Sequence, residues 1–423
     1  MRVSHICYGN LSGGASKGAY NLHLALLDEG VDSNFICSHR PGIGETASVD
    51  YLAKTNSTKF LFRVFRKLNH LASRGEPESK WLFSSDKFAY VRDLSNLCKN
   101  SDVINLHWIN GGFVSPYSLL RIKQPVVWTF RDMWPFTGGC HYSMNCDNYV
   151  QGCGNCPHFS GSDKRFKARR QFERKESIVS NKSNLYGVGI SPWITESARR
   201  SAIWSNSNLR TIWNGVRVEQ FPYVRRSSAI RRLGLSEDYN YISFGALNHS
   251  LGYKGSEKFI EVLNLTEQDP DFAKVKFLVF GDSKALLRGN EGGRVIDFGL
   301  VKDQNKLNLI YAASSGFLAT SIQEAFGKTI VESLSSGTPV VTFRTSAFID
   351  MFNHMVQGFH AESFSSSSLI EGMKWCIGLA RNKNEADYEE LRKVISRYAG
   401  RFDSVKCAKS YKSLYEEIAS KDT

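Results

Sequence analysis

Short apolar runs alternate with longer amphipathic segments along most of the chain, and this alternation predicts a parallel α/β fold. Residues 1–30 read as an apolar strand, a glycine-rich turn and an amphipathic helix, and a second short strand follows over 31–38. The polar stretch 41–58 predicts a loop. Two more apolar runs, 102–108 and 125–130, predict buried strands, so the first half of the chain has the pattern of a Rossmann-type domain.

Polar and aromatic side chains follow the two later strands. His107 and Trp108 end the first strand, and Arg131 and Asp132 end the second. Ligands of open α/β sheets bind outside the carboxyl ends of the strands, so we expect these four residues at a ligand cleft. A histidine that ends a strand is also common as a hydrogen-bonded structural residue, and this alternative stays open for His107.

Gly13 and Gly14 stand where the first strand gives way to the first helix. At such a position the backbone can approach a phosphate group, and the helix N-terminus favours an anion. The surrounding GGASKG does not have the G-x-G-x-x-G spacing of a dinucleotide site. A plain tight turn is therefore the alternative interpretation.

The second half of the chain repeats the strand and helix alternation from about Tyr241 onward, and its most informative stretch is 317–341. This stretch reads as a buried strand, a polar loop with Glu324, a helix with Glu332, a glycine cap at Gly337 and a second strand. Eight helical residues span about 12 Å. A glycosidase pair needs at most about 9.5 Å, so the two carboxylates are not a hydrolytic pair.

The backbone between the two carboxylates opens a helix N-terminus, whose N–H groups and dipole favour an anion such as a diphosphate. The four residues concerned are Phe326, Gly327, Lys328 and Thr329. Taken alone, Glu324 and Glu332 would be solvated side chains of a loop and a helix. The surrounding pattern favours two contacts with different parts of one long ligand.

Length and charge narrow the class of protein. A chain of 423 residues predicts two domains. Residues 1–200 contain 26 Lys and Arg against 16 Asp and Glu, which is +10 of the total net charge of +13. This asymmetry favours a lipid surface or a phosphorylated ligand, and we expect no nucleic-acid partner because no nucleic-acid-binding module is recognisable. No apolar run reaches the roughly 18 residues of a membrane span.

The first residues show no signal-peptide pattern, so we expect a cytoplasmic protein. Residues 59–74 alternate apolar and basic side chains that partition onto two faces of a helix. Such a helix fits contact with the anionic inner face of the cell membrane. The alternative is a helix packed on its own domain with a solvated basic face.

Four cysteines fall within seventeen residues, with the spacing C-x5-C-x6-C-x2-C. They are Cys140, Cys146, Cys153 and Cys156. Four thiolates suit a closed tetrahedral zinc site with a structural role. Two disulfides or four free thiols are the alternatives.

Three motifs together resemble glycosyltransferase family 4, whose members are retaining enzymes of the GT-B fold. They are the E-x7-E unit within 317–341, the segment WTFRDMWPFTGGCHY at 128–142, and the N-G-V turn at 214–216. The second motif is similar to the branch that contains colanic-acid-type bacterial polysaccharide glycosyltransferases. The resemblance implies two Rossmann-like parallel-sheet domains that face a central cleft.

The resemblance also implies domain limits and a function. We expect an N-terminal acceptor-side domain over 1–215 with a Cys-rich insertion, a nucleotide-sugar-binding domain over 216–395, and a C-terminal helix over 396–423 that returns toward the first domain. The implied reaction moves a hexose-type sugar from a nucleotide-diphosphate sugar to a saccharide or lipid-linked saccharide, in polysaccharide or O-antigen-type synthesis. No cofactor takes part in the implied catalysis.

Residue roles follow from the same resemblance. Glu324 binds hydroxyl groups of the donor sugar, Glu332 the ribose, and Lys254 the diphosphate, together with the helix N-terminus and the loop of Gly13 and Gly14. Family members usually have His where this chain has Arg131, a residue that can hold an anion but cannot act as a base near neutral pH. The leaving phosphate is then the group that takes the acceptor proton.

Two other classes of function stay open. A GT-B sugar epimerase or phosphorylase would use a similar cleft. A non-catalytic protein that binds nucleotide sugars is possible because Arg131 departs from the family pattern.

Overall fold

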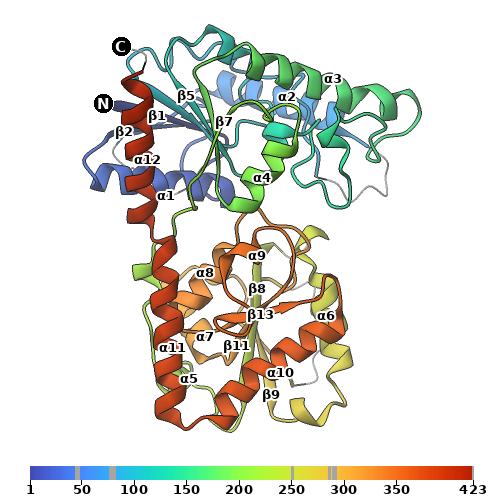
Figure 1. The fold of residues 1–423 in the computed structure, drawn as a ribbon, viewed down its shortest axis with the longest axis vertical. Helices are drawn as coiled ribbons and strands as arrows, with labels where there is room; N and C mark the ends of the chain where they lie inside the picture. The colour runs from blue at the N-terminus through green and yellow to red at the C-terminus, as the bar shows by residue number, and fades with distance from the viewer. Residues whose placement is uncertain (43–47, 76–81, 249–251, 284–286, 288–292, 422–423) are drawn as a thin grey trace. The chain divides into compact units, whose positions relative to one another are not determined.

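The structure is a computed structural model that describes residues 1–42, 48–75, 82–248, 252–283, 287 and 293–421. The chain divides into two compact units (Figure 1). Unit 1 comprises Met1–Gly215 and Ser404–Thr423, and unit 2 comprises Val216–Asp403. Each unit is built on one parallel sheet, so the predicted pair of Rossmann-like domains is confirmed.

The sheet of unit 1 has the strand order β3-β2-β1-β4-β5-β6-β7, and the strand pairs are all parallel. The strands are β1 (Arg2–Cys7), β2 (Asp32–Cys37), β3 (Val49–Tyr51), β4 (Val103–Leu106), β5 (Val126–Phe130), β6 (Leu185–Gly189) and β7 (Asn208–Thr211). The strand order reverses between β1 and β4. Loops that follow these two strands therefore lie at the point where such sheets bind ligands.

The described part of unit 1 has five α-helices. They are α1 (Gly14–Asp28), α2 (Asn56–Ser73), α3 (Gly161–Ser180), α4 (Pro192–Arg200) and α12 (Ser404–Ala419). Successive side chains of β5 alternate between the two faces of the sheet. Val127 packs with α1 and α12, whereas the rings of Trp128 and Phe130 contact Trp204. Helix α12 is thus part of the core of unit 1, although it follows unit 2 in the chain.

The sheet of unit 2 has the order β10-β9-β8-β11-β12-β13, again with parallel pairs. The strands are β8 (Asn240–Asn248), β9 (Val275–Asp282), β10 (Val295–Asp297), β11 (Gly316–Ala319), β12 (Val340–Phe343) and β13 (Gly358–Ala361). The helices are α5 (Arg226–Arg232), α6 (Ser256–Leu265), α7 (Gln304–Ala313), α8 (Lys328–Ser335), α9 (Phe348–Met351), α10 (Ser366–Asn382) and α11 (Glu385–Ala399). The strand order reverses between β8 and β11.

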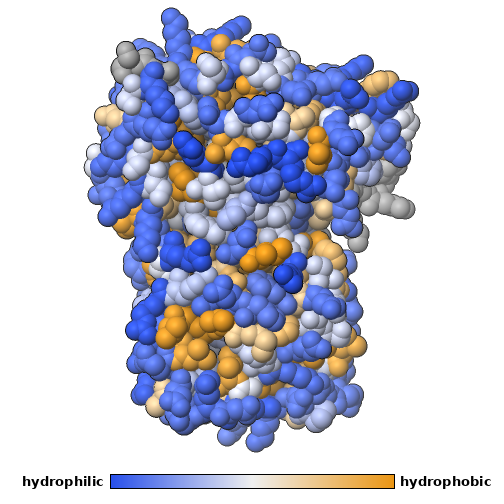
Figure 2. Space-filling view, in the orientation of Figure 1, coloured by the Kyte–Doolittle hydropathy of each residue, from blue (hydrophilic) through white to orange (hydrophobic). Residues whose placement is uncertain are grey.

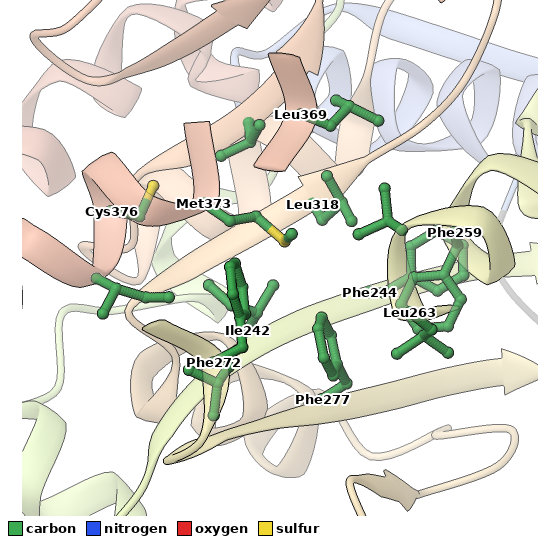
Figure 3. Close-up of a cluster of buried hydrophobic side chains, with 14 of the residues drawn as sticks. Ile242, Phe244, Phe259, Leu263, Phe272, Phe277, Leu318, Leu369, Met373 and Cys376 are labelled. Carbon is green, nitrogen blue, oxygen red and sulfur yellow. The ribbon is translucent and has the colours of Figure 1, made fainter. Parts of the chain in front are cut away.

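One face of this sheet packs against α6 and α10 (Figure 3). Phe244 of β8 stacks on Phe259 of α6, with their ring centroids 3.9 Å apart. Leu318 of β11 lies between this pair and the side chains of Leu369 and Met373 from α10. Full burial of each such side chain stabilises the fold by roughly 1.5 to 3 kcal/mol, so this cluster fixes β8 and β11 beside each other.

Two predictions about local structure are wrong. The loop predicted over 41–58 contains the short edge strand β3, and its residues 43–47 lie outside the described residues. The C-terminal helix does not begin at 396: α11 ends at Ala399, and α12 begins at Ser404. Asp403 between them is extended and pairs with Val216, which explains the break and assigns 396–403 to unit 2.

Candidate functional site

The loops that follow β8 and β11 meet at the reversal point of the unit 2 sheet, because the two strands are direct neighbours. The first loop contains the short 3-10 helix η5 (Gly252–Lys254), and the second starts at Thr320. The ammonium group of Lys254 is hydrogen-bonded to the Glu324 carboxylate. Two predicted site residues that lie 70 positions apart in the sequence therefore form one ion pair.

Gly255 determines how closely the two loops approach. Its φ is +65°, and a Cβ atom on it would stand 1.9 Å from the carbonyl oxygen of Thr320. The Thr320 hydroxyl donates to the carbonyl oxygen of Lys254 at 3.1 Å, and the amide of Ile322 donates to that of Tyr253 at 2.7 Å. These contacts hold Lys254 against the end of β11.

Lys254 keeps its charge in this position. Burial alone would lower the pKa of Lys254, but the Glu324 carboxylate and the neighbouring Tyr253 outweigh it, and the net shift is upward. Ser321 donates a second hydrogen bond, of 3.1 Å, to the same carboxylate oxygen of Glu324. Glu324 thus has two side-chain donors, Lys254 and Ser321, one from each of the loops that follow β8 and β11.

That helix is α8, which begins at Lys328 with Gly327 as its N-cap and no capping side chain. A Cβ atom on Gly327 would lie 2.7 Å from the ring of Phe348 and 3.2 Å from the sulfur of Met351. Glycine at this position therefore lets α9 pack against the start of α8. The predicted glycine cap after the helix is confirmed, since Gly337 has φ +82°.

Glu332 is buried inside α8 and already has two partners. The Tyr311 hydroxyl donates to one carboxylate oxygen at 3.0 Å, and the Lys328 ammonium lies 2.8 Å from the other. Burial, together with the Glu332 carboxylate, holds the pKa of Tyr311 well above its usual value. Both carboxylate oxygens of Glu332 thus have a partner within unit 2.

The glycines of the first loop lie at the start of α1 in unit 1. Gly13 is the N-cap of α1, and no side chain caps the helix. A Cβ atom on Gly14 would meet no described atom within 4 Å. Packing within the described residues therefore does not require glycine at position 14. The space beside this position, at the helix N-terminus, is open.

Arg131 directly follows β5 in the chain, and it is buried. One guanidinium nitrogen donates to the side chain of Asn214. A Cβ atom on Gly18 of α1 would stand 2.9 Å from this guanidinium, so glycine makes room for it. The Nε atom of Arg131 is buried without a hydrogen-bond partner.

The carboxylate of Asp132 is hydrogen-bonded to other groups of unit 1. It accepts hydrogen bonds from the indole of Trp108 at 2.9 Å and the amide of Trp134 at 2.9 Å, and it contacts the His141 ring nitrogen at 2.6 Å. These contacts fix the loop after β5. Trp108 and Asp132 are residues that the sequence pattern predicts at this edge, whereas the only sequence signal for His141 is its proximity in the chain to Asp132.

His107 belongs to a group of buried histidines under α12. Its Nε2 atom lies 2.9 Å from Nδ1 of His5, and the two rings stack. Burial, with smaller effects of Arg131 and His5, holds the pKa of His107 well below its usual value. A neutral, buried imidazole fits the structural alternative for this residue better than the role of a base.

The four cysteines of the Cys-rich insertion line one small cavity of unit 1, together with Thr137, Gly138, Tyr149 and Ala168 among others. All four are free thiols. Within the described ranges, no three His, Cys, Asp or Glu side chains are already gathered closely enough to hold a metal ion. The structure therefore brings the predicted ligands together and leaves their role open.

Helix α2 corresponds to the predicted amphipathic segment. It packs on the rest of unit 1 through the buried Phe62. The ring centroids of Phe62 and Tyr90 are 4.3 Å apart. Phe60 is 61% exposed and Leu71 is 47% exposed. In the view of Figure 2, hydrophilic residues cover most of the visible surface, and hydrophobic ones occur in small groups. No helix in the described part of the chain is long and apolar enough to cross a bilayer.

Two parallel-sheet units, each with one reversal of its strand order, give the chain the GT-B fold that the solved glycosyltransferases below share. Residues 228–399, which lie in unit 2, match the family described as Glycosyl transferases group 1.

Known proteins resemble most or all of the chain at low sequence identity. "Putative colanic acid biosynthesis glycosyl transferase WcaC" of Escherichia coli is 22% identical over 357 residues, which are 79% of this chain and 81% of that protein. Sucrose-phosphate synthase from Thermosynechococcus elongatus shares the fold with a TM-score of 0.68, 17% identity and 99% coverage of both chains. Anabaena Alr3699/HepE in complex with UDP and glucose matches with a TM-score of 0.61 and 14% identity, over 99% of this chain and 100% of that chain.

Proposed function

We propose that the protein transfers a hexose-type sugar from a nucleotide-diphosphate sugar to a saccharide acceptor, with retention at the anomeric carbon, in the synthesis of a bacterial polysaccharide. The observation that carries this proposal is the ion pair of Lys254 with Glu324, which lies in the loop that leads into the N-terminus of α8. The complex of HepE with UDP and glucose supports a uridine diphosphate hexose as the class of donor.

The proposed chemistry depends on charge stabilisation at the leaving diphosphate. Lys254 is a fixed cation, and the first turn of α8 offers backbone N–H groups at the positive end of a helix dipole. One well-placed donor of this kind contributes about 10²- to 10³-fold to a rate. Glu324, released from Lys254 by the incoming phosphate, is free to bind the hydroxyl groups of the donor sugar.

Unit 1 supplies the acceptor side in this proposal. The N-terminus of α1 at Gly13 and Gly14 has no capping side chain, so its backbone N–H groups offer donors for a phosphate or a sugar oxygen. Arg131 remains charged, so it orients and does not accept a proton. The leaving phosphate takes the proton of the attacking hydroxyl, and no metal cofactor takes part.

The donor site is tested by paired substitutions. Glu324→Gln and Lys254→Met should each lower transfer by 100-fold or more, because each removes a contact made to the reacting donor. The control is Glu261→Gln in α6, whose carboxylate pairs with Lys258 on the surface. Unchanged turnover of both site variants, measured with a panel of nucleotide sugars, would refute the proposal. The anomeric proton signal of the product in NMR reports retention or inversion.

We also propose that the acceptor is lipid-linked and that α2 holds the protein at an anionic membrane. Exposed apolar and basic side chains lie together on this helix: Phe60, Leu61, Leu68 and Leu71 with Arg63, Arg66 and Lys67. The triple change of these three basic residues to Glu should abolish flotation with vesicles that contain anionic lipid. The same charge change at Lys164, Arg165 and Lys167 of α3 is the control. Equal flotation of both variants would count against α2.

A further inference from the structure

The loop between Cys140 and Cys156 has little regular structure to hold it. It contains only the short 3-10 helix η3 (Asn148–Val150), and three of its non-glycine residues, Met144, Cys153 and Asn155, have positive φ. Each such residue costs roughly 1 to 2 kcal/mol relative to an ordinary conformation. Contacts made by the rest of the loop must therefore hold these conformations.

A backbone donor points at one sulfur atom of this loop. The amide of Gly138 donates a hydrogen bond of 3.0 Å to the sulfur of Cys153. A backbone N–H group that points at sulfur stabilises negative charge on it. The loop after β5 is therefore already in contact with one of the four cysteines.

The packing around the cavity brings the backbone close to the sulfurs. A Cβ atom on Gly138 would stand 2.8 Å from Cβ of Cys153 and 2.6 Å from the carbonyl oxygen of Ala168. Glycine at position 138 thus lets the strand-end loop, the Cys-rich loop and α3 meet at one point. The thiols of Cys140 and Cys156 contact each other across this cavity.

We propose that Cys140, Cys146, Cys153 and Cys156 bind one Zn²⁺ ion as four thiolates. Zinc is commonly held in structural sites by four sulfurs in a tetrahedron, with Zn–S distances of about 2.3 Å. Binding releases the four thiol protons and leaves the site with a net charge of −2. The sulfurs move inward from the positions they have as free thiols.

A buried cation complements this charge. Lys175 of α3 is fully buried, and its ammonium lies 3.9 Å from the ring centre of Trp134. Cys153 and Cys140 are within electrostatic range of it. Zinc would thereby fasten the Cys-rich loop to α3 and to the loop after β5. This role is structural and does not depend on which reaction the protein performs.

The test is the metal content of the whole chain, purified without chelator from zinc-containing medium. We expect about one zinc per chain in the native protein. The double change Cys153→Ser and Cys156→Ser should lose it, whereas Cys98→Ser, a change at a buried thiol of the same unit, should retain it. Less than about half an equivalent of zinc in the native protein overturns the proposal.

A second measurement on the native protein covers the case in which the double variant does not fold. Titration with a mercurial reagent should release zinc as cysteine thiolates react, and cobalt in place of zinc should give the absorption of a tetrahedral thiolate site. Peptide mapping without reductant distinguishes the alternative: disulfides that link these cysteines in freshly purified protein would overturn the zinc site.

Discussion

Gly255 offers the sharpest test of how the loops of unit 2 are held together. Alanine at this position adds one methyl group in a left-handed conformation, which costs about 1 to 2 kcal/mol. The added carbon would stand 1.9 Å from the carbonyl oxygen of Thr320. That oxygen belongs to the backbone and cannot rotate away, so the loop must shift. We expect Gly255→Ala to destabilise unit 2 by roughly 2 to 4 kcal/mol in total.

Thermal unfolding measures the first consequence, and a nucleotide titration measures the second. The midpoint for unit 2 should fall by roughly 5 to 15 °C, given about 2 to 4 °C per kcal/mol for a unit of this size. The loop shift also moves Lys254 away from Glu324. In the proposed function, Glu324 contacts the sugar of the nucleotide-sugar donor. Stabilisation of the variant by a nucleotide diphosphate should therefore be smaller than that of the native protein.

The matched control for this prediction is Gly252→Ala in the same loop. A Cβ atom on Gly252 would meet no described atom within 4 Å. This variant should unfold and bind nucleotide like the native protein. If Gly255→Ala behaves like Gly252→Ala in both measurements, the contact between the Lys254 loop and the end of β11 does not position the site.

Two further predictions concern buried polar groups. Tyr311→Phe should lower the free energy of unfolding, measured in urea, by about 1.5 to 3 kcal/mol, because it removes a hydrogen bond to the buried Glu332 carboxylate. Tyr241→Phe should lower it less, because the Tyr241 hydroxyl donates to a neutral carbonyl. Unit 1 should lose stability as the pH falls below about 6.5, because burial lowers the pKa values of three histidines. The expected loss in the free energy of unfolding is about 1 kcal/mol per histidine at pH 5.5. These histidines are His5, His23 and His107.

The sign of the acid effect follows from where the protons bind. The unfolded chain takes up a proton on each histidine near pH 6.5, whereas burial lowers the folded-state pKa of His23 to about 4. The full stability is therefore present above pH 6.5 and is lost as the pH falls toward 4. His23→Gln should flatten this dependence, and the exposed His70→Gln should not. An equal slope in both variants would refute the assignment.

The strand and helix pattern predicted most of the fold because buried parallel strands are short and almost wholly apolar. The run at 125–130 illustrates this, since all residues of β5 are buried. The strand β3 was missed because its three residues, Val49–Tyr51, include a charge and lie at a sheet edge. The break at 400–403 was missed because it depends on a bridge between Asp403 and Val216, which are distant in sequence.

The parts of the site that lie within one short segment of the chain were predictable from the sequence. The helix N-terminus at Gly327 and the cap at Gly337 follow from residues within one short stretch. The pairing of Lys254 with Glu324 depends on β8 and β11 being neighbours, which no local pattern determines. The two partners of Glu332 depend likewise on how α7 packs on α8, since one of them is Tyr311.

Helix α12 has a consequence for how the protein is made. Tyr411 and Tyr415 fill the core of unit 1 beside Val3 and Val127, and their hydroxyl groups contact Thr129 and Asn105. On a ribosome, the strands of unit 1 emerge before all of unit 2, but they can close their core only when 404–419 have been synthesised. Unit 2, whose segments are contiguous, is therefore able to fold first. The first half of the chain is then the last to be completed.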